Sequence, residues 1–476
     1  MKKTLTILLS LLLVLPASAS QKETEKKDSP VKEHLQNHFK LYGFIRNFFV
    51  YDSRDSKAGT GDLFYYLPLD NKWNTADVNN PAREDLNASP NFRFLALTSR
   101  VAFDVSGYYI NNLHFGAKVE GDFYSGLAAA KTANGLSGNT SVSGTAQARL
   151  RQAYVTLTWK DLPMRNDKTA QLDLKIGQAW HPMAADMPHV FSLEAGAPFG
   201  PFSRTPQVTM DAALGEHWIL SAAAIWQQQY QSAGPDGASA AYMKYACTPE
   251  VYAAVTLKGK EVLFRGGVDV VSIKPRNIGK NADGLTVHVK DRKTSVLGYL
   301  YGQYNHKLLS IKAKTTFGEG GEHMNLMSGY AVVDKTDPTN WKYASMLNSS
   351  SWLSLCYGKK WQGVLYLGYV KNFGLADKVA PGYIESSDVY FCGNGFSNIN
   401  QMYRINPQLL YNLGKFTLGL EYQWTSVQYG DYRKGDYQIG GQQVKLTSGL
   451  NGIALATDNL HWVGNNRVNM MVKFTF

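Results

Sequence analysis

The most constraining feature of the sequence is an alternation of apolar and polar residues that begins near residue 40 and continues to the last residue. Residues 112–124 show it clearly, with Leu113 and Phe115 on one face and Lys118 and Glu120 on the other. Successive side chains of a β-strand point to opposite faces, so this period predicts strands rather than helices. The alternating segments are about ten residues long, which is the length that a tilted strand needs to cross a membrane. We therefore expect an all-β fold whose strands span a membrane.

The alternating segments predict a transmembrane antiparallel β-barrel of about 16 strands. The strand that ends at Phe476 must then pair with the one that begins near Lys40, because an unpaired backbone group in lipid costs several kcal/mol. The predicted strands lie near residues 40–51, 93–106, 112–124, 146–160, 170–180, 204–212, 217–229, 248–258, 261–274, 294–306, 309–318, 350–358, 361–371, 402–413, 416–427 and 465–476.

The connections between these strands alternate in length, which predicts short periplasmic turns and long extracellular loops. Aromatic residues flank the short turns, as in the interfacial girdle of a barrel; they are Trp159, Trp218, Trp361 and Phe416. The short connections lie near 107–111, 161–169, 213–216, 259–260, 307–308, 358–360 and 414–415. The long ones cover 52–92, 125–145, 181–203, 230–247, 275–293, 319–348, 372–401 and 428–464.

The N-terminus predicts export. Lys2 and Lys3 precede an apolar run that is followed by Ala17-Ser18-Ala19, so residues 1–19 form a predicted signal peptide. Residues 20–39 are then a short charged periplasmic segment, and residues 40–476 are the barrel. Lysine and arginine number 49 against 38 acidic residues, an excess that in an exported protein favours small anions or lipid head groups over nucleic acid.

Other motifs give weaker signals. The three cysteines describe neither a disulfide framework nor a zinc site, although a bridge between Cys247 and Cys392 is left open. His34 and His38 are four residues apart, which fits a solvated helix face better than a metal site. The loop YDSRDSKAGTGD could hold calcium, but its arginine and lysine favour a plain solvated loop. We therefore predict no metal site, no cofactor and, in the absence of hydrolase motifs, no enzyme.

Three segments give the sequence its likeness to a known family: TSRVAFDV (98–105), RLRQAYVTL (149–157) and KIGQAWHPM (175–183). Together with the terminal strand, they resemble the DcaP-like and phosphate-selective (O and P type) porins of Gram-negative outer membranes. The resemblance implies a sixteen-stranded barrel, usually trimeric, that passes small and often anionic solutes. The chain departs from the longest members of the family, because too few residues precede its first strand for an N-terminal coiled coil.

Basic residues on the polar face of the strands are the first candidate site. A lysine or arginine facing lipid near the bilayer centre costs about 2–4 kcal/mol, so these side chains should point into the lumen and attract anions. Acidic residues such as Glu120 and Asp122 are interleaved with them, so a lumen of mixed charge is the alternative. The predicted pore-lining residues are Arg100, Lys118, Arg149, Arg151, Lys175, Arg265, Lys312, Lys314 and Arg404.

The connection 181–203, HPMAADMPHVFSLEAGAPFGPFS, is the second candidate because it is far more apolar than the other long loops. An exposed apolar loop would favour aggregation, so we expect this one to fold into the barrel and narrow the pore. Asp186 and Glu194 would then oppose Arg100, Arg149 and Arg151 across the lumen. The alternative is a loop that packs on the outside or at a trimer interface.

The sequence thus predicts an outer-membrane porin, embedded in lipid and forming a homotrimer, for passive diffusion of small hydrophilic solutes with an anion preference. The alternative is a receptor or adhesin whose loops bind a polymer while the barrel anchors them. A membrane-embedded hydrolase is disfavoured, and a transporter with a plug domain would need about 22 strands.

Overall fold

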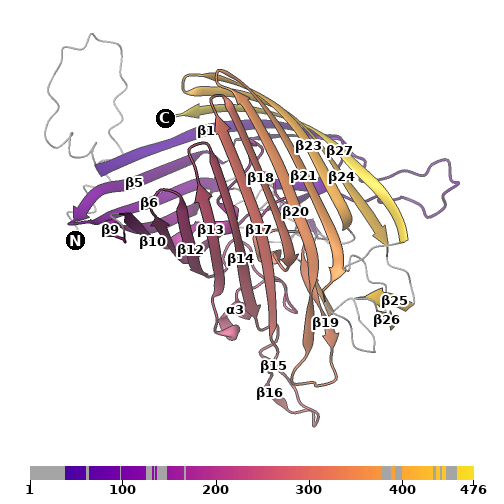
Figure 1. The fold of residues 1–476 in the computed structure, drawn as a ribbon. Helices are drawn as coiled ribbons and strands as arrows, with labels where there is room; N and C mark the ends of the chain where they lie inside the picture. The colour runs from indigo at the N-terminus through magenta and orange to yellow at the C-terminus, as the bar shows by residue number, and fades with distance from the viewer. Residues whose placement is uncertain are drawn as a thin grey trace.

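The computed structural model of the chain describes residues 38–59, 64–96, 98–124, 131–132, 135–136, 147–165, 168–376, 388–391, 399–431, 436–439, 442–445 and 458–476. Within these ranges, sixteen antiparallel strands form one closed barrel (Figure 1), which confirms the predicted fold class. The predicted signal peptide lies outside the described residues.

Each of the sixteen predicted strands has a counterpart in the barrel wall. In order around the wall the strands are β1 (Phe39–Asp52), β5 (Arg100–Ile110), β6 (Leu113–Tyr124), β9 (Gln147–Pro163), β10 (Thr169–Trp180), β11 (Arg204–Leu214), β12 (Trp218–Ile225), β13 (Glu250–Lys258), β14 (Val262–Ile273), β17 (Lys293–His306), β18 (Leu309–Glu319), β20 (Lys342–Gly358), β21 (Trp361–Leu375), β23 (Ile399–Leu413), β24 (Phe416–Asp431) and β27 (Asp458–Thr475).

The first and last strands close the barrel. β27 pairs with β24 on one side and with β1 on the other, in a register that runs from Phe44 opposite Thr475 to Asp52 opposite Arg467. The backbone of Phe476 exchanges hydrogen bonds of 3.1 and 3.2 Å with that of Gly43. The alternation that continues to the final residue therefore serves to remove both edges of the sheet.

The second predicted strand, 93–106, is interrupted in the structure. β4 (Asn91–Leu95) and β5 both pair with β1, but Thr98 between them has a left-handed backbone with φ of 76°. The Arg46 Nε–H donates a hydrogen bond of 3.1 Å to the Thr98 hydroxyl, so the interruption brings a polar atom to a partly buried guanidinium. Hydrophobic alternation alone did not reveal this break.

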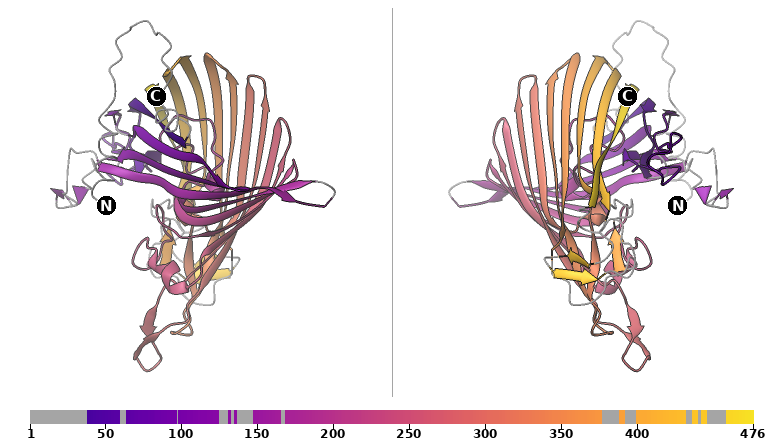
Figure 2. Two further views of the ribbon diagram at one scale, coloured as in Figure 1. Left: turned by 90° about the vertical axis from the view of Figure 1, so that its left-hand side faces the viewer. Right: turned by 90° about the vertical axis from the view of Figure 1, so that its right-hand side faces the viewer.

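The long connections gather at one end of the barrel and the short turns at the other (Figures 1 and 2). In the described part of the chain, no helix is long and apolar enough to span a membrane. The elements of the long connections include α3 (Ala241–Ala246), η1 (Pro182–Ala184), η2 (Glu322–Met324), β2 (Ser56–Gly59), β3 (Phe64–Pro68), β7 (Lys131–Thr132), β8 (Gly135–Leu136), β15 (Ile278–Lys280), β16 (Thr286–His288), β19 (Gly329–Asp334), β22 (Val389–Phe391), β25 (Asp436–Ile439) and β26 (Gln442–Lys445).

The wall strands separate an apolar exterior from a largely polar interior. Along β13, Val251 and Val255 are half exposed on the outside, whereas Glu250, Tyr252 and Thr256 are buried on the inside. The aromatic residues Trp218, Trp361 and Phe416 next to the short turns are also half exposed. This is the surface that a lipid bilayer covers in a transmembrane barrel.

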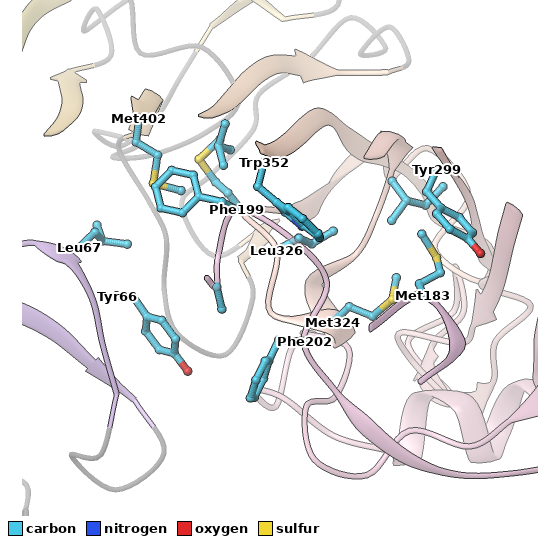
Figure 3. Packing of buried hydrophobic residues seen from close by; sticks show 14 of the residues in the cluster. Tyr66, Leu67, Met183, Phe199, Phe202, Tyr299, Met324, Leu326, Trp352 and Met402 are labelled. Carbon is cyan, nitrogen blue, oxygen red and sulfur yellow. The ribbon is translucent and has the colours of Figure 1, made fainter. Parts of the chain in front are cut away.

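An apolar cluster nevertheless occupies part of the lumen (Figure 3). Met183, Phe199 and Phe202 of the connection 181–203 meet Met324 and Leu326, which belong to or follow η2. Inward side chains of the wall, including Trp352 and Tyr299, complete the cluster. This packing determines where the connection 181–203, hereafter the inner loop, lies.

Candidate solute passage

The inner loop begins on the wall formed by β13 to β18. Nζ of Lys314 donates hydrogen bonds of 2.7 and 2.9 Å to the carbonyls of Met183 and Asp186. Lys312 reaches the carbonyl of Met187 at 3.3 Å, and Arg265 forms an ion pair of 2.5 Å with the Asp186 carboxylate. These basic side chains therefore satisfy the carbonyl and carboxylate groups of the loop.

Farther along, the inner loop lies on β20 to β27. The backbone N–H of His189 donates to Ser354 on β20, and the Tyr366 hydroxyl on β21 donates to the carbonyl of Gly196. The Glu194 carboxylate lies 3.4 Å from both Arg404 and Arg467 and accepts a hydrogen bond of 2.9 Å from Gln423. The loop thus runs along one half of the inner wall, from β13 to β27.

The other half of the wall carries five arginines on β1, β5, β9 and β11. We call this set, Arg46, Arg100, Arg149, Arg151 and Arg204, the basic strip. Around a ring of sixteen strands, β6 lies opposite β18, so the strip faces the wall that the inner loop covers.

Aromatic rings and two carboxylates connect the arginines of the basic strip. The guanidinium groups of Arg46 and Arg100 lie 4.8 and 5.1 Å from the ring centre of Phe44. In the same way, those of Arg151 and Arg204 lie 5.7 and 4.9 Å from the ring of Trp180. These contacts join four of the five arginines into two pairs, Arg46 with Arg100 and Arg151 with Arg204.

Glu120 and Asp122 on β6 are the acidic partners of this surface. Arg151 contacts both carboxylates at 2.7 Å, and Arg149 binds Asp122 through two nitrogens at 2.8 and 2.9 Å. Arg100 lies 3.6 Å from Glu120. Three of the five guanidinium groups contact these two buried carboxylates, so the strip of five arginines keeps an excess of positive charge.

A polar cavity of about 450 Å³ adjoins the basic strip. Nη1 of Arg204 is buried and makes no hydrogen bond with any residue that the structure describes. The cavity is lined by Arg149, Leu150, Gln178, Arg204, Gln228, Gln229 and Tyr230. It therefore offers several hydrogen-bond donors to a bound anion or a polar solute.

The structure places eight of the nine predicted pore-lining residues in two groups, with Lys175 apart from both. Arg265, Lys312, Lys314 and Arg404 contact the inner loop, and Lys314 and Arg404 are almost fully buried there. Arg100, Lys118, Arg149 and Arg151 lie on β5, β6 and β9, where Lys118 pairs with Asp104 at 3.4 Å. Lys175 on β10 lies 5.3 Å from the ring of Tyr154.

The two loop carboxylates, expected to oppose the arginines across the lumen, form ion pairs with the part of the wall that the loop covers. Asp186 binds Arg265, and Glu194 contacts Arg404 and Arg467, whereas Arg100, Arg149 and Arg151 pair with Glu120 and Asp122 of the wall. The physical reason is that a carboxylate buried under a folded loop must find its partner on the surface it covers. Asp186 and Glu194 therefore hold the loop and do not face the strip as ion-pair partners.

Three arginines of the lumen, Arg46, Arg204 and Arg467, were not among the predicted residues. Arg46 and Arg467 occupy polar positions of alternating strands, and this signal could have identified them. Arg204 follows directly on the inner loop and begins β11, so its place depends on where the loop ends.

The weaker sequence signals have simpler explanations where the structure describes them. In the loop YDSRDSKAGTGD, considered above for calcium, Asp52 contacts Arg467 and Arg93, which supply the positive charge that calcium would bring. His38 contacts the carbonyl of Ser106 at 2.9 Å. Cys247 is exposed. Asp62, His34 and Cys392 lie outside the described residues.

A closed antiparallel barrel with an apolar exterior and a polar interior is a transmembrane barrel of the outer-membrane type. Such a fold places the protein in the outer membrane of a Gram-negative bacterium. Among solved structures, the chain is similar to the outer membrane channel DcaP of Acinetobacter baumannii, with a TM-score of 0.55 and 16% identity, covering 92% of this chain and 97% of that one.

Two further solved structures are similar over the same share of this chain, 92%. The anion-selective porin from Comamonas acidovorans has a TM-score of 0.48 and 10% identity, with 99% of its chain covered. OmpT, an outer membrane protein of Vibrio cholerae, has a TM-score of 0.45 and 11% identity, also with 99% covered. At these identities the likeness shows the fold alone. No family profile and no curated protein matches the sequence.

Proposed function

We propose that the protein is an outer-membrane porin through which small hydrophilic solutes diffuse passively, with a preference for anions. The observation that carries this proposal is the basic strip, because it faces the lumen on the half of the wall that the inner loop leaves uncovered. Arg100 and Arg149 keep 23% and 20% of their side chains exposed, so solutes in the lumen can reach them.

The anion preference follows from electrostatics in a narrow wet pore. Fixed guanidinium groups raise the local concentration of anions, and walls of low dielectric constant strengthen their field. Guanidinium forks bind carboxylate and phosphate groups through paired hydrogen bonds, so small solutes of these two classes are the expected cargo.

We also propose that the protein forms a homotrimer, the assembly implied by the sequence resemblance. Light scattering of the detergent-solubilised protein, corrected for bound detergent, should then give three chains per particle. A particle containing a single chain would contradict this assembly without affecting the proposal of a channel.

Conductance in a planar lipid bilayer tests the channel itself. The purified protein should open in discrete steps, and in a salt gradient its reversal potential should move toward the equilibrium potential of the anion. A reversal potential on the cation side would overturn the anion preference. An absence of conductance would instead favour the alternative of a barrel that anchors receptor or adhesin loops.

The role of the basic strip can be tested with the double variant Arg100→Gln and Arg149→Gln. Loss of two lumenal charges should move the reversal potential toward zero, because the positive field becomes weaker. Arg292→Gln removes an exposed charge outside the lumen and should leave the potential unchanged. Equal effects of the two changes would show that the net charge of the protein, and not the strip, sets the selectivity.

A further inference from the structure

Four buried side chains from distant parts of the chain meet near the start of the inner loop. His181 begins the loop, Glu250 begins β13, Asp269 belongs to β14, and His323 belongs to η2. One potential ligand atom from each residue lies within 4.8 Å of those from the others. All four residues are at most 2% exposed, so water cannot screen their charges.

The two carboxylates of this group lack the cationic partners that burial normally requires. Among the described residues, their ion-pair contacts are to the two histidines, and neither carboxylate contacts a lysine or an arginine. Oε2 of Glu250 and Oδ1 of Asp269 are buried and make no hydrogen bond there, and the same holds for both ring nitrogens of His323. Burying these two carboxylates costs free energy unless a further positive charge compensates them.

The spacing of three of these residues fits a metal ion. Zinc binds nitrogen and oxygen ligands at about 2.0–2.2 Å, so two ligands of a tetrahedral site lie about 3.3–3.6 Å apart. Nε2 of His323 lies 3.6 Å from Oδ2 of Asp269, at the upper end of this range, and 3.1 Å from Oε1 of Glu250, slightly below it. An imidazole with two carboxylates suits a divalent transition metal, whereas calcium and magnesium prefer oxygen ligands alone.

His181 has a different role from His323. Its Nε2 lies 2.5 Å from Oε1 of Glu250, which is too close for two ligands of one ion and fits a hydrogen bond. Its Nδ1 accepts the backbone N–H of Met183 at 3.1 Å, so the proton of the neutral ring is on Nε2 and points to the carboxylate. A carboxylate that binds a metal is commonly oriented by such a donor.

We propose that Glu250, Asp269 and His323 bind one divalent transition-metal ion of the zinc class, with His181 as the hydrogen-bond donor that positions Glu250. The ion would neutralise the two carboxylates and join η2 to β13 and β14. Through His181 it would also fix the first residue of the inner loop. This site is independent of the proposed channel function, and no motif in the sequence indicated it.

Refolding the full mature chain, without a histidine tag, from urea into detergent micelles tests the site. Protein refolded with zinc and then passed through a desalting column should retain one zinc per chain by mass spectrometry of the metal. It should also unfold at a higher temperature than protein refolded with a chelator. Cobalt in place of zinc should give visible absorption bands typical of bound ions, a readout that needs no variant.

Variants identify the ligands. His323→Gln and Asp269→Asn should each lose the bound zinc, whereas His181→Gln should keep it with an affinity lower by about 10–100-fold. His306→Gln is the matched control, because His306 forms an exposed pair of 2.8 Å with Glu261 and should retain zinc as the native chain does. Folding of every variant is checked by its heat-dependent mobility on gels.

Several results would overturn the proposal. The first is that the folded native chain holds no more zinc than the His323→Gln variant and shows no cobalt absorption bands. Protons alone would then compensate the two carboxylates. Retention of zinc by both His323→Gln and Asp269→Asn would refute these ligands. Equal stabilisation of the protein by calcium or magnesium would refute the assignment of the site to a transition-metal ion.

Discussion

Glycines on the inner wall make room for aromatic side chains of the inner loop. A Cβ atom at Gly368 on β21 would lie 2.5 Å from the ring of Phe199, and one at Gly419 on β24 would lie 2.9 Å from Phe191. Both distances are shorter than a carbon contact allows. The absence of a side chain at these two positions therefore lets the loop lie flat against the strands.

Gly368→Ala should destabilise the protein by about 1–3 kcal/mol, because the added methyl group pushes Phe199 out of a close-packed site. Gly363→Ala on the same strand is the control, since a Cβ atom there meets nothing within 4 Å. Urea unfolding midpoints of the two variants in the same detergent make the comparison. Equal midpoints would mean that Phe199 relaxes at no cost and that the glycine is not needed for packing.

The inner loop, considered as an element, is fixed by polar contacts at two acidic residues in its middle and by apolar contacts on either side of them. Asp186 and Glu194 contact Arg265, Arg404 and Arg467, while Met183 and Phe199 enter the apolar cluster. The acidic side chains and the wall arginines compensate one another, so removing one member would leave a buried charge. Both kinds of contact are needed to hold an apolar segment inside a barrel that contains water.

Deleting residues 184–200 and joining the ends with a short glycine linker should raise the single-channel current, because the loop occupies part of the lumen. Shortening the β15–β16 hairpin by residues 279–287 is the control, since this hairpin projects beyond the barrel end (Figure 2) and its loss should leave the current unchanged. The single-channel current of both variants is measured in a planar bilayer and compared with that of the native protein. An unchanged current in the loop deletion would place the solute path elsewhere.

At the scale of the whole molecule, the barrel depends on one pairing between the two ends of the chain. β1 and β27 are more than 400 residues apart in sequence, yet they pair over nine positions of the register. Without this pairing two strands would expose their backbone groups to lipid, at a cost of several kcal/mol per group. Closure is therefore a condition for membrane insertion.

A disulfide can test the register of this closure. Phe49 and Met470 are directly opposed and both face outward, and opposed Cβ atoms in a sheet lie about 4.5–5.5 Å apart. In a chain whose native cysteines are replaced by serine, Phe49→Cys with Met470→Cys should crosslink on mild oxidation.

The control for this crosslink moves one cysteine along the same strand. Leu41 also faces outward but lies eight residues from Phe49 along β1, so Leu41→Cys with Met470→Cys should stay reduced. Mass spectrometry of unreduced peptides detects the bond in either variant. A crosslink in the control and none in the test pair would contradict the register.

The strands, their number and the closing pair could be predicted from the sequence, because side chains in a two-faced sheet alternate with period two. Three other features could not be predicted from the sequence. They are the ion-pair partners of Asp186 and Glu194, the interruption at Thr98, and the cluster formed by His181, Glu250, Asp269 and His323. Periodicity determines which face a side chain takes but not which distant residue it meets. The sequence by itself determined a closed membrane barrel, since alternation is a local property of each strand. Only the tertiary structure decided which basic residues hold the inner loop and which face the passage, because that depends on the half of the wall that the loop covers.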